Sequence, residues 1–124
     1  MNQIFLIAIG GAMGALGRHW MVSLINGISR GHFPYGTLFV NFLGSFFIGV
    51  MYVLITERLT LHPDWRNIAM IGFLGAFTTF STFSLETIAL LENGQLLTAG
   101  LYTSSSLLFC FMAAWGGIHL ARII

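Results

Sequence analysis

The stretch "GAFTTFSTFSLET", from Gly75 to Thr87, decides how this chain must fold, because it places many polar side chains inside an apolar segment. Six of its thirteen residues are Thr or Ser, three are Phe, and the carboxylate of Glu86 lies near its end. A hydroxyl left without a hydrogen bond in hydrocarbon costs several kcal/mol. These hydroxyls must therefore either bond one another or line water.

The composition of the chain is that of an integral membrane protein. Of its 124 residues, 56% are hydrophobic and 7% are charged, and the mean hydropathy is +0.86. Soluble domains carry about 25% charged residues, so this chain lacks the surface that water requires. The net charge of +1 and the absence of lysine argue against nucleic-acid binding. Cys110 is the only cysteine, which excludes an internal disulfide and a thiolate metal cluster.

Four segments are long and apolar enough to cross a bilayer, which takes about 20 residues per helix. The segment nearest the N-terminus could pass for a signal peptide. It has no basic residue before its apolar core, however, so we expect it to be retained as the first transmembrane helix. The loops are too short to hold a further domain, and residues 1–124 are therefore predicted to form a single four-helix transmembrane domain. The expected spans are Gln3–Leu24, Tyr35–Thr56, Asn67–Leu91 and Leu96–Ala121.

The arginines give only a weak signal for orientation. Arg58, Arg66 and Arg122 fall on the side of the N-terminus, whereas Arg30 falls on the opposite side, where Arg18 joins it if it lies near the end of the first span. Orientation follows the excess of basic residues near span ends, and here the excess is small. Two copies inserted in opposite directions would form an inverted pair like the inverted repeats of transporters. A single orientation fits these charges equally well.

Small residues in the first span allow close helix packing. Gly10 and Gly14 have the small-xxx-small spacing that lets helix backbones approach each other in lipid. This spacing serves packing within one chain or between two chains equally well. Because a four-helix bundle fills its own centre with side chains, we expect a permeation path to run between protomers.

Polar residues recur every four positions in two of the spans, which places each set on one helix face. Each set either bonds neighbouring helices or lines a path, and the sequence favours neither reading. The sets are Thr37, Asn41 and Ser45 in the second span, and Tyr102, Ser106 and Cys110 in the fourth.

The third span is expected to contain a break near Gly75–Thr79, because glycines there precede β-branched and hydroxylated residues that compete for backbone hydrogen bonds. Carbonyls freed by such a break could bind a bare cation. Phe80 and Phe83 share a face, and the positive edges of their rings could face a small anion. From the residues alone, the prediction is a narrow polar path for a small ion; fluoride fits this path but is not singled out.

Three motifs resemble, in order, those of the Fluc (CrcB) family of fluoride channels. They are "GGAMGALGR" (Gly10 to Arg18), "GTLFVNFLGSFFIG" (Gly36 to Gly49) and "GFLGAFTTFSTF" (Gly72 to Phe83), and they cover three of the four expected spans. The resemblance implies an all-α membrane protein with a broken third helix, assembled as an antiparallel, dual-topology homodimer in the bacterial inner membrane. It implies passive export of fluoride down its electrochemical gradient, which protects against fluoride toxicity, and no enzymatic activity.

The same resemblance assigns roles to individual residues. Gly75 and Thr78 would hold a structural Na⁺ at the dimer centre through their backbone carbonyls, and Arg18 and Glu86 would flank the path. Cys110 departs from the family pattern, since a hydroxyl is expected there and a thiol is a weaker donor; His19 departs where an aromatic residue commonly follows the arginine. The residues implied to line the fluoride pore are Asn41, Phe80, Phe83, Ser81, Thr82, Thr37, Tyr102 and Ser106.

Two other functions stay open at this stage. A small multidrug-type, proton-coupled exporter would need an acidic residue inside the first span, which has none, so Glu86 would have to substitute. A non-conducting membrane scaffold would use every polar set for packing. Glu86 is also awkward for an anion channel, because a carboxylate repels anions unless it is protonated, paired with a hydroxyl or distant from the path.

Overall fold

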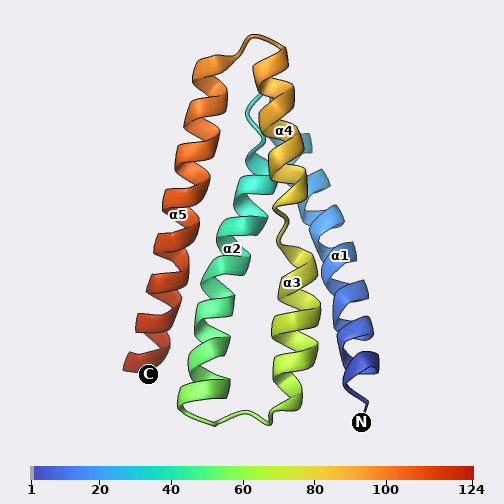
Figure 1. Cartoon of the computed structure of the whole chain (residues 1–124), viewed down its shortest axis with the longest axis vertical. Helices are drawn as coiled ribbons and strands as arrows, with labels where there is room; N and C mark the ends of the chain where they lie inside the picture. Colours follow the sequence, from blue (N-terminus) through green and yellow to red (C-terminus); the bar gives the residue numbers. More distant parts are fainter. Residues whose placement is uncertain (1) are drawn as a thin grey trace.

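The computed structural model describes residues 2–124, and it confirms the four predicted spans. They run Gln3–Ile28, Tyr35–Glu57, Arg66–Glu92 and Leu96–Ile123. The first continues past its predicted end at Leu24, because the helix includes the short polar stretch that follows. Both chain ends and the connection between the second and third spans lie at the same end of the molecule (Figure 1).

Each of the second and third spans consists of more than one helical element. In the second span, α2 (Tyr35–Tyr52) continues as the π-helical η1 (Val53–Glu57). In the third span, the π-helical η2 (Arg66–Leu74) continues into α3 (Gly75–Phe77), and α4 (Ser81–Glu92) completes the crossing. The first and fourth spans are single helices, α1 (Gln3–Ile28) and α5 (Leu96–Ile123).

Local signals fix several helix ends. The side chain of Asn2 accepts a hydrogen bond from the Ile4 amide at 2.9 Å and so caps α1. Pro34 precedes α2, where its missing N–H costs nothing. Gly94 joins α4 to α5 with a φ of +78°, a conformation that glycine adopts without strain.

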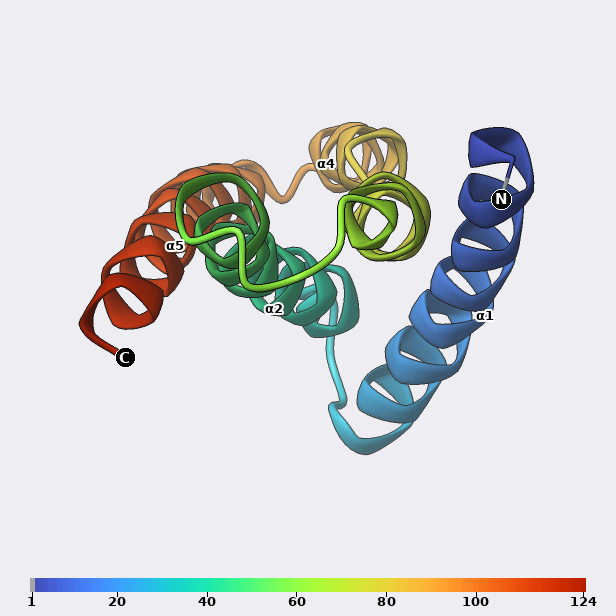
Figure 2. The ribbon, with the colours of Figure 1, turned by 90° about the horizontal axis from the view of Figure 1, so that it is seen from below.

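Glycines bring the helices together within the chain. A Cβ at Gly10 or Gly14 would collide with the carbonyl oxygens of Ile68 or Phe73, so these glycines pack α1 against η2. Gly49 faces the backbone of α5 in the same way, and α2 and α5 lie side by side (Figure 2). Of the two packing roles left open for Gly10 and Gly14, the structure thus shows the one within a single chain.

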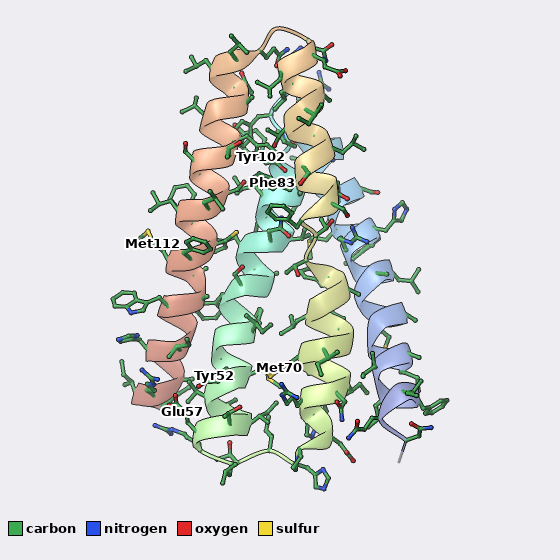
Figure 3. The ribbon with its side chains drawn as sticks, in the orientation of Figure 1. Tyr52, Glu57, Met70, Phe83, Tyr102 and Met112 are labelled. Carbon is green, nitrogen blue, oxygen red and sulfur yellow. The ribbon has the colours of Figure 1, made fainter. Side chains whose placement is uncertain are left out.

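Charged groups join α5 to the end of the second span. Arg122 donates two hydrogen bonds to the Glu57 carboxylate, from Nε at 3.0 Å and from Nη2 at 2.7 Å. Arg58 donates to the backbone carbonyl of Arg122. Glu57 is labelled at this end in Figure 3. These contacts fix the C-terminus of α5 at the end of the molecule where charges can remain hydrated.

Most apolar side chains of the four spans are not buried within the chain. Only 17–28% of the most apolar window of each span is buried within the chain. The buried cluster in the half away from the chain ends consists of Phe83, Leu90, Ala99 and Tyr102. The remaining apolar surface is free to contact lipid or another chain.

Candidate ion path

The third span changes conformation between α3 and α4, and Asn41 of α2 holds the backbone there. Thr78 is extended, with φ −86° and ψ 159°. The Thr79 amide donates to Oδ1 of Asn41 at 2.7 Å, and Nδ2 of Asn41 donates to the Thr79 carbonyl at 3.0 Å. One amide side chain therefore satisfies both backbone groups of Thr79, and we call this pair of bonds the Asn41 clamp.

Two backbone carbonyls lose their helical partners as a result. In a continuous helix, the Thr79 amide would donate to the Gly75 carbonyl, but here it donates to Asn41. The Thr82 amide would donate to the Thr78 carbonyl, but here it donates to Oγ1 of Thr79 at 3.1 Å. Thr79 thus caps the start of α4, and the carbonyls of Gly75 and Thr78 are released from these bonds.

A groove of about 400 Å³ lies beside the Asn41 clamp, and we call it the mid-span groove. A Cβ at Gly44 would collide with the Thr78 side chain, so glycine lets the extended segment approach α2. The groove combines an amide, hydroxyls, a thiol and aromatic rings. Its lining residues are Asn41, Gly44, Ser45, Ile48, Thr78, Thr79, Phe80, Phe83, Ser106, Leu107, Cys110 and Phe111.

A second, smaller cavity of about 220 Å³ lies nearer the end of the molecule that is opposite the chain ends, and we call it the upper cavity. It brings one cation and one carboxylate together with several hydroxyls. Its lining residues are Arg18, His19, Val22, Ser23, Thr37, Thr79, Thr82 and Glu86.

Thr79 lines both spaces, and each space also contains a buried hydroxyl without a partner. Thr37 is 1% exposed and borders the upper cavity, whereas Ser106 is 5% exposed and borders the mid-span groove. Neither hydroxyl oxygen has a hydrogen-bond partner among residues 2–124. A buried polar group left unsatisfied costs about 1–3 kcal/mol. Water or an ion in the bordering space would satisfy either hydroxyl.

The aromatic residues form an edge-on series beside the groove. The rings of Phe80 and Phe83 lie 5.5 Å apart at 61°, and those of Phe83 and Tyr102 lie 5.0 Å apart at 65°. Phe83 and Tyr102 lie close together between α4, α2 and α5 (Figure 3). Phe80, by contrast, is 73% exposed. The series therefore runs from the buried core to an open surface of the single chain.

Glu86 has a hydroxyl partner. The Tyr102 hydroxyl donates to Oε1 of Glu86 at 3.0 Å. Of the three situations considered for this carboxylate, pairing with a hydroxyl is the one that the structure contains. The Tyr102 hydroxyl therefore offsets part of the negative charge on the Glu86 carboxylate.

The predicted site residues are distributed over these features. Ser81 is exposed, and its hydroxyl lies 3.3 Å from that of Thr79. Gly75 is also exposed, and neither residue lines the groove or the upper cavity. Sequence reasoning missed Thr79, although a Thr three residues before Thr82 at a helix start has the spacing of an N-cap. The other predicted residues lie in the groove, in the upper cavity or between them: Asn41, Phe80, Phe83, Ser106, Thr78, Thr37, Thr82, Arg18, Glu86 and Tyr102.

These features define a class: a multi-pass helical membrane protein whose polar groups gather at bilayer depth around an interrupted span. The particular family follows from comparison with known proteins. The family model described as "CrcB-like protein, Camphor Resistance (CrcB)" matches residues 5–118. The chain belongs to this family, as its three motifs predicted.

Curated relatives are similar over nearly the whole chain. A relative from Methylococcus capsulatus is 49% identical over 97% of this chain, which spans 53% of that longer protein. One from Hahella chejuensis is 45% identical over 98% of this chain and 96% of its own length. One from Nitratidesulfovibrio vulgaris is 40% identical over the full length of both. Each of the three is named "Fluoride-specific ion channel FluC".

Proposed function

We propose that this chain forms a passive, fluoride-selective channel in the bacterial inner membrane. The two buried hydroxyls without partners, Thr37 and Ser106, carry this proposal, because they lie in polar spaces that share Thr79. Donor groups at that depth suit an anion that must replace its hydration shell. The relatives named as fluoride-specific channels supply the identity of the ion.

The chemistry of the lining favours a small anion over a large one. Hydroxyls donate one short hydrogen bond each, and the Asn41 amide has a second hydrogen beyond the one used by Thr79. The ring edges of Phe80 and Phe83 carry positive partial charge. No lysine is present to hold an anion tightly. Selectivity then depends on the bore and the number of donors, as in other filters.

The complete pore is proposed to form between two antiparallel copies. Phe80 and Phe111 line the groove and are 73% and 71% exposed, so the groove lacks a wall on this side. A second copy would supply that wall and cover apolar surface. The near balance of arginines between the two ends permits insertion in both directions. Two copies in opposite orientation would give two equivalent pores.

A structural Na⁺ is proposed at the released carbonyls. Carbonyl oxygens are suitable ligands for a hard cation, and Gly75 and Thr78 have lost their helical donors. One chain offers too few ligands, so we expect the partner copy to contribute the same two carbonyls. The cation would supply positive charge that holds the two interrupted spans together.

Flux would be driven by the membrane potential, which is worth about 2.3 kcal/mol per charge per 100 mV. An inside-negative potential expels an anion. Hydrogen fluoride enters cells uncharged and dissociates inside, so this pathway lets the cell lose the anion and limits its toxicity.

Reconstituted vesicles test the proposal. We expect rapid, voltage-driven fluoride efflux that needs no proton gradient and greatly exceeds chloride efflux. Dependence on a proton gradient would support a coupled exporter instead. Fluoride-tight vesicles containing intact, folded protein would refute the channel and favour a scaffold.

A further inference from the structure

The mid-span groove contains the only thiol of the chain. Cys110 lies on α5, is half-buried and lines the groove together with Ser45 and Ser106. A cysteine that packs in lipid or in a dry core is inert toward polar reagents, whereas a thiol in contact with water can ionise and react. The surroundings of Cys110 therefore decide what it can do.

Ser106 supports the inference that the groove holds water or an ion. Its side chain is 5% exposed, its hydroxyl has no partner among the described residues, and it lies one helical turn before Cys110. Because an unsatisfied buried hydroxyl is costly, the groove that it borders should be hydrated. Water that reaches Ser106 also reaches the neighbouring thiol.

We propose that Cys110 is a modification site for small, water-borne thiol reagents, and that one adduct on its sulfur closes the ion path. This inference rests on the proposed channel function. The groove measures about 400 Å³ and Cys110 is part of its lining, so a substituent of several heavy atoms on the sulfur would take up part of the space through which an ion would pass. An anionic substituent adds electrostatic repulsion of a permeating anion.

A methanethiosulfonate reagent makes the chemistry explicit. The Cys110 thiol gives its proton to water, and the thiolate attacks the sulfur that carries the 2-sulfonatoethyl group. A disulfide forms, the bond to the sulfonyl group breaks, and methanesulfinate leaves with the electron pair. Dithiothreitol reverses the adduct: its two thiols are oxidised to a cyclic disulfide, the mixed disulfide is reduced, 2-sulfonatoethanethiol leaves, and the Cys110 thiol is regenerated.

The experiment treats vesicles containing the full chain with 2-sulfonatoethyl methanethiosulfonate on both sides of the membrane. Fluoride efflux and the mass of the protein are measured before treatment, after treatment and after dithiothreitol. We expect one adduct per chain, at least a tenfold loss of efflux, and recovery on reduction. Each variant is compared with its own untreated efflux.

Two variants serve as controls. Cys110→Ser should gain no mass and lose no efflux on treatment. Met112 is 55% exposed and points away from α2 (Figure 3), so the double variant Cys110→Ser, Met112→Cys places the thiol toward lipid. We expect neither rapid labelling nor inhibition in that variant.

The outcomes separate the inference from the function on which it rests. Wild-type protein that conducts fluoride but gains no adduct, although it reacts fully once denatured, would show that the groove is closed to water. An adduct without loss of efflux would place Cys110 outside the path. Absence of efflux from untreated protein would refute the channel itself, while the mass change would still report whether the thiol is accessible.

Discussion

The Asn41 clamp predicts a large loss of stability when the amide is replaced by an apolar side chain of similar size. In the wild-type chain, the Thr79 N–H lies 2.7 Å from Oδ1 of Asn41 and the Thr79 carbonyl lies 3.0 Å from Nδ2. In Asn41→Leu, each of these two backbone groups loses its hydrogen-bond partner. Neither group can return to a regular helix bond without moving the extended segment at Thr78. The perturbation therefore acts on two backbone groups through one side chain.

The magnitude follows from the cost of leaving polar groups unsatisfied at a half-buried position. That cost is about 1–3 kcal/mol per group, so two groups give about 2–6 kcal/mol. Rearrangement or entry of water would bring the value toward the lower end of this range. We also expect a strong loss of fluoride efflux, since Thr79 lines both the groove and the upper cavity.

The assay is the free energy of unfolding in mixed micelles, measured together with efflux from vesicles. Asn26→Leu is the matched control within the same chain. Asn26 has an exposed side chain near the end of α1 and accepts a single hydrogen bond, from the Gly36 amide at 3.2 Å, so its replacement affects one backbone group instead of two. We expect Asn26→Leu to lose about 1 kcal/mol or less.

Two results would refute this reasoning. Equal losses of unfolding free energy for the two variants would show that the clamp contributes no more than one ordinary hydrogen bond. Unchanged efflux in a destabilised Asn41→Leu protein would show that the position of Thr79 does not matter for conduction.

Three further predictions concern charge, pairing and packing. Asn41→Asp should lower fluoride efflux roughly a hundredfold when it is assayed at alkaline pH, which keeps the new carboxyl ionised. A negative charge about 5 Å from the ion, at an effective dielectric constant of about 20, costs about 3 kcal/mol. Unchanged efflux would show that Asn41 does not line the path. Tyr102→Phe should lower fluoride efflux, because it leaves the Glu86 carboxylate without its hydrogen-bond donor. Adding Glu86→Gln to this variant should restore efflux. Additive losses in a double-mutant cycle would argue against a functional pairing of Tyr102 with Glu86. Gly14→Ala should cost about 1–3 kcal/mol of unfolding free energy because its Cβ meets the η2 backbone, while Gly100→Ala, which meets nothing, should be close to neutral; equal losses would contradict the packing of α1.

The spans could be predicted from the sequence because bilayer thickness fixes their length and composition. The errors lie at the ends, as at Leu24, where polar residues near the membrane surface are compatible with continued helix. The partner of Gly10 and Gly14 could not be predicted, since their spacing specifies a close approach but not which helix approaches. The structure places η2 there.

The candidate site was predicted as sets of polar residues, but its central connection was not. Helical spacing placed Thr37 and Asn41 on one face, and both now border polar spaces. The clamp joins residues 38 positions apart, so no local pattern contains it. An amide side chain matches the donor and acceptor of a peptide group, but the sequence does not reveal which peptide group it meets. Thr79 was missed for this reason.

The rearranged hydrogen bonds around Thr79 make the anion lining and the released carbonyls a single structural unit. The Thr79 amide donates to Asn41 and so leaves the Gly75 carbonyl without its helical donor. In the same way, the Thr82 amide donates to the Thr79 hydroxyl and leaves the Thr78 carbonyl without its donor. The same bonds set the start of α4 and thus the position of Phe80. A change at Asn41 must therefore disturb the proposed cation ligands and the anion lining together. A change at Ser106, which takes part in none of these bonds, should alter the anion lining alone. Fluoride efflux and its dependence on Na⁺ are therefore measured in variants at Asn41 and at Ser106. The comparison separates the contribution of the anion lining from that of the cation ligands.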